Sequence, residues 1–260
     1  MIRKALFLIV VITAAAGSAL ADAQADAIMQ ASYALPQAQS MQATLYMLLV
    51  DAHGGQSLRA MSMYSRKVAG GTDSYTVFLS PPDVQGTKFL SLATPDGGDV
   101  QRIWLPALGK VRRIAGGGKG EKFVGSDLTY YDMASHHFSD ARYTMHGEDV
   151  VQVVVRGTET KVDCWVIDST PVDPSVPYGR IRVWVGKDDS FIYRSTMWDG
   201  HGSDLKSIYI LEVEKGDGVI LPIRTGVIAA DGHKTLLQMN NVQLNRPIDP
   251  GLFTVANLER

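Results

Sequence analysis

The sequence of 260 residues has few cysteines, no excess of positive charge and no basic amphipathic segment, and each shortage argues against a class of protein. It has one cysteine, Cys164, so it cannot form an internal disulfide, and its core must provide the stability. Lysine and arginine number 25 against 27 for aspartate and glutamate, so the chain lacks the basic excess with which nucleic-acid-binding proteins neutralise phosphates. No segment combines a basic face with an apolar one, which argues against a role on a bilayer surface. We therefore expect neither a nucleic-acid partner nor stable membrane insertion.

Long apolar runs are also scarce, and the one near the N-terminus has the features of a secretion signal. Ile2-Arg3-Lys4 is positively charged, Ala5 to Ala16 is almost wholly apolar, and Ala19-Leu20-Ala21 supplies the small residues that signal peptidase recognises. A membrane anchor is the alternative, but the run is shorter than the roughly 20 residues that a spanning helix needs. No cysteine follows the run, so a lipid anchor is not expected there. We expect residues 1–21 to be cleaved and residues 22–260 to form one exported domain.

Reactive constellations are missing as well. The glycine run at 116–120 contains a lysine but lacks the spacing and the Ser or Thr of a phosphate-binding loop. His136 and His137 are adjacent, so they diverge on a strand or a helix, and solvated loop histidines are favoured over a metal site. Ser126 lacks the second glycine of a nucleophile elbow, and Cys164 lies in an apolar strand where a buried, inert thiol is expected. The sequence therefore predicts no enzyme, no metal and no cofactor.

What the chain does have is a succession of short β-type segments. After one amphipathic helix expected at 23–35, runs rich in Val, Ile, Thr and Tyr alternate with Gly, Asp and Pro turns. These runs are 42–51, 56–67, 72–79, 87–94, 100–105, 142–146, 150–157, 161–168, 179–186, 191–198, 207–215, 219–229 and 235–244. With no βαβ alternation and no repeat, they predict a mainly β protein whose antiparallel sheet has about ten to eleven strands and is strongly curved or closed.

Some of these runs do not alternate between apolar and polar residues. Residues 45–50, 150–155 and 208–211 are almost continuously apolar, so both faces of those strands should lie away from water. A curved sheet that wraps a helix or an apolar ligand, with partial cover outside, would explain this pattern. A thick β core with extra helical cover would explain it equally, and the pattern alone does not separate the two.

Several segments, taken in order, resemble one protein family. They are Phe78-Leu79 with Pro82, Gly86 to Leu90, Ile103 to Ile114, Phe123 to Asp132, Val183 to Asp188 and Phe253 to Leu258. They are similar to the outer membrane lipoprotein-sorting protein-like family, relatives of the periplasmic lipoprotein carrier of the Lol system. The resemblance implies an unclosed antiparallel β-barrel wrapped around a few helices, with an apolar cavity between them. It also implies a periplasmic carrier or chaperone that moves acyl chains of a lipoprotein or phospholipid towards the outer membrane.

Candidate residues for the cavity follow from this resemblance. The expected lining is Tyr46, Leu48, Phe78, Phe89, Leu90, Trp104, Phe123, Tyr130, Tyr131, Met133 and Trp184, with the helix at 23–35 as a candidate lid. Each of these side chains also suits an ordinary core. Arg112 and Arg113 have two interpretations. They form a basic rim for a lipid phosphate or an acidic patch of a transporter, or a solvated hairpin whose arginines point to opposite faces, one pairing with Asp127 or Asp132.

Three functions are therefore in question. The leading hypothesis is a carrier of lipid or lipoprotein. The second is a non-enzymatic accessory protein that docks on an inner-membrane export transporter. The third, a hydrolase of lipid or glycan, has the least support because the reactive residues are missing.

Overall fold

A computed structural model describes residues 12–216 and 218–259, and its dominant feature is a long sheet. The strands are β1 (Ser40–Val50), β2 (Gln56–Val68), β3 (Gly71–Ser80), β4 (Lys88–Ala93), β5 (Asp99–Leu105), β6 (Lys110–Ile114), β7 (Ala141–Val155), β8 (Thr158–Pro171), β9 (Arg180–Gly186), β10 (Ile192–Trp198), β11 (Asp204–Gly216), β12 (Val219–Ala229) and β13 (Lys234–Leu244). The helices in the same residues are α1 (Ile12–Tyr33), α2 (Val255–Leu258) and the short 3-10 helices η1 (Pro106–Leu108), η2 (Gly116–Gly120), η3 (Phe123–Gly125), η4 (Phe138–Asp140) and η5 (Pro250–Phe253). None of these helices is long and apolar enough to cross a membrane.

All strands of the described residues belong to one 13-stranded sheet. Its order is β10-β9-β8-β7-β11-β12-β13-β1-β2-β3-β4-β5-β6. Neighbours pair antiparallel except β7 and β11, which pair in parallel. Because β10 also pairs with β11, the strands β7 to β11 form a closed circuit, which we name the strand circuit, whereas β6 ends the sheet with one neighbour.

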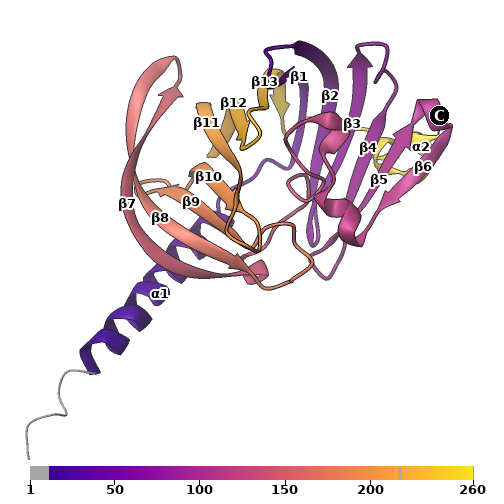
Figure 1. Ribbon diagram of the computed structural model, residues 1–260. Helices are drawn as coiled ribbons and strands as arrows, with labels where there is room; N and C mark the ends of the chain where they lie inside the picture. The colour runs from indigo at the N-terminus through magenta and orange to yellow at the C-terminus, as the bar shows by residue number, and fades with distance from the viewer. Residues whose placement is uncertain (1–11, 217, 260) are drawn as a thin grey trace, which may run out of the picture.

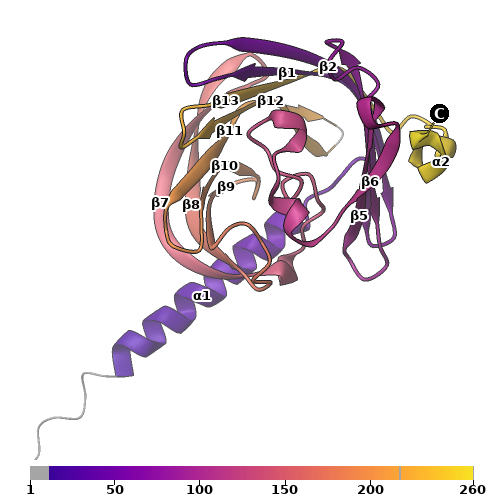
Figure 2. The same ribbon diagram turned by 45° about the vertical axis from the view of Figure 1, so that its right-hand side comes forward.

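The sheet curves into an unclosed barrel, as Figures 1 and 2 show. The predicted fold class is therefore confirmed, with 13 strands in place of the expected ten to eleven. The prediction of a break at 147–149 is wrong, because β7 runs through these residues. A bulge between Met145 and Gly147 lets this strand bend without ending.

The helix expected at 23–35 is present but begins earlier and ends at Tyr33. Its buried residues Ala25 and Met29 pack against Tyr143, Ile167 and other residues of β7, β8 and β9. The remainder of the expected signal segment, residues 1–11, lies outside the described residues. Figure 1 shows the first part of the described helix projecting away from the sheet.

The inner, concave face of the sheet holds the largest core. Its buried residues are Leu45, Met47, Met61, Phe78, Phe89, Ile103, Ile114, Phe123, Leu128, Tyr130 and Val227. A separate cluster that includes Cys164, Trp184 and Val213 lies within the strand circuit. Cys164 is fully buried, and burial raises the pKa of its thiol to about 12, so the expectation of a buried thiol is confirmed.

The outer, convex face is covered only in part. Phe253 and Leu258 of the C-terminal segment pack against Tyr75 and Leu90. Apolar side chains of other strands remain open, and we name these the outer apolar strip: Tyr46 (37% exposed), Leu58 (56%), Leu211 (37%) and Ile228 (45%). The expectation that both faces of β1 and β11 lie away from water is therefore wrong, because no described segment covers their outer side.

Candidate functional site

The chain between β6 and β7, residues 115–140, lies inside the curve of the sheet (Figure 2). We name it the inner segment. It holds η2, η3 and η4, and its one isolated β-bridge joins two of its own residues, Lys122 and Thr129. Because no strand of the sheet continues into it, its position depends mainly on side-chain contacts and a few single hydrogen bonds.

Aromatic side chains join the inner segment to the concave face. The ring of Phe123 lies edge-on to Phe89 at 5.1 Å between centroids, and 6.0 Å from the ring of Phe78. Tyr130 lies 5.9 Å from Phe89 and 5.6 Å from Phe123. All four rings are buried, and each such pair contributes about 0.5–1.5 kcal/mol beyond the burial of area. The contact is apolar and joins two separate parts of the chain.

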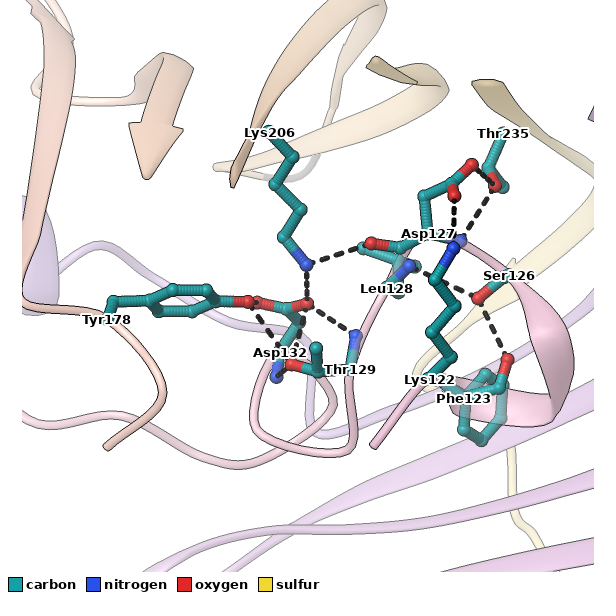
Figure 3. Close-up of polar contacts among 10 residues, drawn as sticks. All are labelled: Lys122, Phe123, Ser126, Asp127, Leu128, Thr129, Asp132, Tyr178, Lys206 and Thr235. Carbon is teal, nitrogen blue, oxygen red and sulfur yellow. Dashed lines mark hydrogen bonds and ion pairs between the residues drawn. The ribbon is translucent and has the colours of Figure 1, made fainter. Parts of the chain in front are cut away.

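Lys206 of β11 forms a buried ion pair with Asp132 of the inner segment (Figure 3). Their side chains are 5% and 7% exposed. The Lys206 ammonium also donates to the backbone oxygen of Asp127 at 2.9 Å, and the Tyr178 hydroxyl donates to Asp132 Oδ1 at 2.8 Å. Burial lowers the pKa of Lys206, and Asp132 opposes this effect. Burial raises the pKa of Tyr178, so its hydroxyl remains a donor.

Thr235 of β13 provides a second polar anchor for the inner segment (Figure 3). Its hydroxyl donates to Asp127 Oδ2 at 2.8 Å and accepts the backbone N–H of Asp127 at 3.0 Å. Lys122 Nζ lies 3.3 Å from Asp127 Oδ1. Both Thr235 and Asp127 are buried, so these bonds are shielded from water and hold the segment against a distant strand.

Arg59 of β2 makes a third contact with the inner segment. Its Nη1 donates to the carbonyl of Val124, and its buried Nε has no partner in the described residues. Burial lowers the pKa of this guanidinium. Val124 has a φ of 47°, which is unfavourable for a β-branched residue. The strained backbone therefore occurs where the segment meets a buried cation.

An open cleft of about 1290 Å³ lies at the end of the inner segment. It is lined by the end of α1 with residues 34–38, by residues 134–139 of the inner segment, and by the first residues of β10 and β12 among others. His136 and His137 belong to this lining. The ring of His136 lies 4.5 Å from that of Tyr131 between centroids, with the two planes tilted by 42°, and burial lowers the pKa of His136. The expectation of solvated loop histidines is therefore wrong, since both are half-buried.

The structure brings five of the eleven predicted lining residues together on the concave face: Phe78, Phe89, Phe123, Tyr130 and Met133. Tyr131 follows them in the inner segment and meets Tyr178 edge-on at 5.5 Å. The others lie elsewhere: Tyr46 and Leu48 on the outer face of β1, Leu90 and Trp104 against the C-terminal segment, and Trp184 in the strand circuit. None of the eleven lines the open cleft.

Arg112 and Arg113 point to opposite faces of β6. Arg112 pairs with Glu121 at 2.5 Å, and this hydrogen bond raises its pKa. The expectation of a pair with Asp127 or Asp132 is wrong, because those carboxylates bind other partners. Arg113 lies directly opposite Arg102 of β5. The arginines therefore sit at the free edge of the sheet.

Sequence patterns did not indicate Lys206, Tyr178, Thr235 or Arg59. Their partners in the inner segment are separated from them by 74, 46, 108 and 65 positions respectively. No local spacing reports a contact of this kind. The described residues contain no group of three or more His, Cys, Asp or Glu side chains that could hold a metal ion.

The sheet is an unclosed β-barrel with a segment packed into its curve, which is a LolA-like fold. A domain from Vibrio parahaemolyticus, assigned to outer membrane lipoprotein sorting, is 26% identical with a TM-score of 0.83 over 92% of this chain and 100% of that one. A DUF1329 family protein from Desulfovibrio piger is 25% identical with a TM-score of 0.78, over 93% and 98%. A LolA superfamily protein from Nitrosomonas europaea, 17% identical with a TM-score of 0.67 over 90% and 98%, shows the same fold.

A family model described as "-like: Uncharacterized protein" matches residues 70–260, and a comparison with curated proteins found no match. The chain belongs to the family that this model describes, and its fold is similar to that of the outer membrane lipoprotein-sorting domain and the LolA superfamily protein. The resemblance noted in the sequence is thereby confirmed, and so is the carrier-like fold that it implies.

Proposed function

We propose that this protein is a periplasmic carrier or chaperone that binds acyl chains of a lipoprotein or phospholipid between the sheet and the inner segment, for transfer towards the outer membrane. Its family and fold support a carrier. Each CH₂ group that leaves water contributes about 0.8 kcal/mol, so an acyl chain needs an apolar shelter on an aqueous path. The protein would act by binding and release, without chemistry on the cargo.

The aromatic contact of Phe123 with Phe78 and Phe89 is the observation that supports this proposal most. In this conformation the concave face is apolar but filled by the protein's own rings. Movement of the inner segment would uncover apolar rings of β3 and β4, which form the kind of surface that acyl chains bind. Release would follow when the segment returns, so two conformations of different lipid affinity are enough for exchange.

The open cleft offers a route for the acyl chains. It adjoins residues 134–139, where the inner segment leaves the concave face for β7. The last residues of α1 line its other side, including Gln30 and Tyr33. This position supports a role for the end of the helix as a lid.

Export by a cleaved signal is part of the proposal. Cleavage after Ala21 would fall within α1, ahead of Ala25 and Met29, which pack the helix on the sheet. The buried part of the helix would therefore remain in residues 22–260 as one domain.

Native mass spectrometry of the mature protein tests the carrier function. Protein purified gently from the periplasm should carry lipid at close to one molecule per chain. Protein stripped of lipid should regain it from phospholipid vesicles. A protein that is isolated empty and takes up no lipid would overturn the proposal.

The outer apolar strip favours a second candidate, an accessory protein that docks on an inner-membrane export transporter. Exposed apolar patches of this kind mark interaction sites. Leu58 and Ile228 are the two most exposed members, and the basic edge at Arg112 and Arg113 would add attraction for an acidic partner. Leu58→Asp with Ile228→Asp should abolish co-purification with the transporter and leave lipid uptake unchanged. Unchanged co-purification would exclude docking through this strip.

A further inference from the structure

Around Lys206, three residues of the barrel donate hydrogen bonds that two residues of the inner segment accept. The donors Lys206, Tyr178 and Thr235 belong to β11, to the loop before β9 and to β13. The oxygens that accept from them belong to Asp127 and Asp132 of the inner segment (Figure 3). The segment thus presents carboxylates and a backbone oxygen to a cation and two hydroxyl groups of the surrounding barrel.

Stability alone does not explain the ion pair of Lys206 and Asp132. The side chains of Lys206 and Asp132 are 5% and 7% exposed, so both charges lose their hydration. A buried pair of this kind is often no better for stability than apolar residues of the same volume. Removing one partner, however, leaves a buried charge without compensation, which is strongly unfavourable.

Displacement of the inner segment would remove the partner of Lys206. A neutral cargo would leave the ammonium and the hydroxyl groups without acceptors. A cargo with a phosphate or carboxylate would replace the oxygens of Asp127 and Asp132, and charge-assisted hydrogen bonds would form again. The exchange is therefore most favourable for an anionic cargo.

We propose that Lys206, Tyr178 and Thr235 form a binding site for the oxyanion of the cargo, which Asp132 and Asp127 occupy in the unloaded protein. This inference rests on the proposed carrier function and specifies its cargo as lipids with an anionic headgroup. The carboxylate of Asp132 takes the place of a ligand phosphate, and the acyl chains lie on the aromatic rings of the concave face. The inner segment then competes with the cargo for the same cation.

Uptake of two lipids with identical acyl chains tests the site. Lipid-free protein is mixed with vesicles that contain phosphatidylglycerol or diacylglycerol, and the bound lipid is measured by native mass spectrometry. The wild type should bind phosphatidylglycerol about tenfold more tightly, the effect of one charge-assisted bond. Equal binding of the two lipids would overturn this site alone, whereas binding of neither would overturn the carrier function with it.

Variants of the two ion-pair partners should act in opposite directions. Lys206→Met should remove the preference for phosphatidylglycerol, whereas Asp132→Asn should increase affinity for it, because the competing carboxylate is neutralised. A purely structural pair would shift both variants in the same direction, and that result would overturn the proposal. If Lys206→Met does not fold, the double variant Lys206→Met/Asp132→Asn, which buries no unpaired charge, should show the same loss of preference.

Lys215→Met is the matched control. Lys215 lies on the same strand and pairs with Asp189 at 2.7 Å, but its side chain is 39% exposed. Its replacement should leave the lipid preference unchanged, and an equal loss would contradict a specific site.

Binding of inorganic phosphate alone distinguishes a free phosphate from a lipid headgroup as the source of the oxyanion. If inorganic phosphate binds to the wild type and not to Lys206→Met, the site belongs to free phosphate. If phosphate does not bind and the preference for phosphatidylglycerol remains, the site belongs to the lipid headgroup.

Discussion

Phe123 of the inner segment meets Phe89 of β4 edge-on, with 5.1 Å between ring centroids. Both side chains are almost fully buried, yet the chain between β6 and β7 joins no strand of the sheet there. An apolar contact without a hydrogen-bonded ladder can open without breaking the barrel. In the proposed carrier, the two rings are therefore the place where acyl chains would replace the protein's own side chains.

Phe89 and Leu90 are neighbours on β4 that face opposite sides of the sheet. Both are 0% exposed, so replacing either with alanine should lower the free energy of unfolding in urea by about 2–5 kcal/mol. Only Phe89→Ala should reduce bound lipid in native mass spectra, because Leu90 packs against Phe253 and Leu258 on the outer face. Equal loss of lipid in the two variants would show that binding follows overall stability.

The ion pair of Lys206 and Asp132 makes a separate prediction for stability. Lys206→Met leaves a buried carboxylate without its cation and should lower the free energy of unfolding by about 3–5 kcal/mol. Adding Asp132→Asn removes that charge and keeps one acceptor oxygen for Tyr178, although the Thr129 N–H loses its acceptor, so part of the loss should be recovered. Urea denaturation of the four proteins measures the coupling. Losses that simply add would show that the two residues do not interact.

His136 should make the fold sensitive to acid. Burial lowers its pKa below the ordinary value of 6.5, although Asp140 and Asp132 oppose the shift. The unfolded chain then binds a proton at a pH where the folded chain does not. This contribution to stability is complete above about pH 6.5 and is lost as the pH falls through the lower pKa of the folded state.

Thermal unfolding between about pH 7 and pH 5 measures this effect. The variant His136→Phe keeps an aromatic ring beside Tyr131 and should show a smaller fall in Tm than the wild type. His53→Phe, in an exposed turn, is the control and should behave as the wild type does. An unchanged pH dependence in His136→Phe would assign the acid sensitivity to other groups.

Processing of the N-terminus can be measured directly. Protein recovered from the periplasm should begin at Asp22, as determined by intact mass. A large residue at the cleavage position blocks signal peptidase, so Ala21→Phe should leave the full-length chain in the membrane fraction. A periplasmic protein that retains residues 1–21 would contradict the predicted signal.

Local patterns predict much of this fold because Gly, Pro and Asp residues mark most of its turns. Pro95-Asp96-Gly97-Gly98 separates β4 from β5 as its residue types predict. Gly147 is one exception, since a bulge inside β7 uses the same residue type as a turn. Whether such a glycine ends a strand or bends it depends on the neighbouring strand, which local pattern does not reveal.

The candidate site is harder to predict for a physical reason. Phe89 and Leu90 are both fully buried, so apolar alternation cannot tell which of them faces the concave side. The burial of Lys206 is equally hard to predict, because its partner Asp132 is 74 positions away and a lysine near the start of a strand is usually exposed. The family resemblance indicated the aromatic residues of the concave face. No feature of the sequence indicated the polar contacts of Lys206, because they depend on tertiary packing.

The most direct test of the account is photocrosslinking with a phospholipid that carries a diazirine near the end of one acyl chain. After loading and irradiation, peptide mass spectrometry locates the labelled residues. We predict labels on Phe78, Phe89 and Phe123, which meet on the concave face. Labels confined to the outer face, at Leu58 or Ile228, would contradict an acyl site beneath the inner segment.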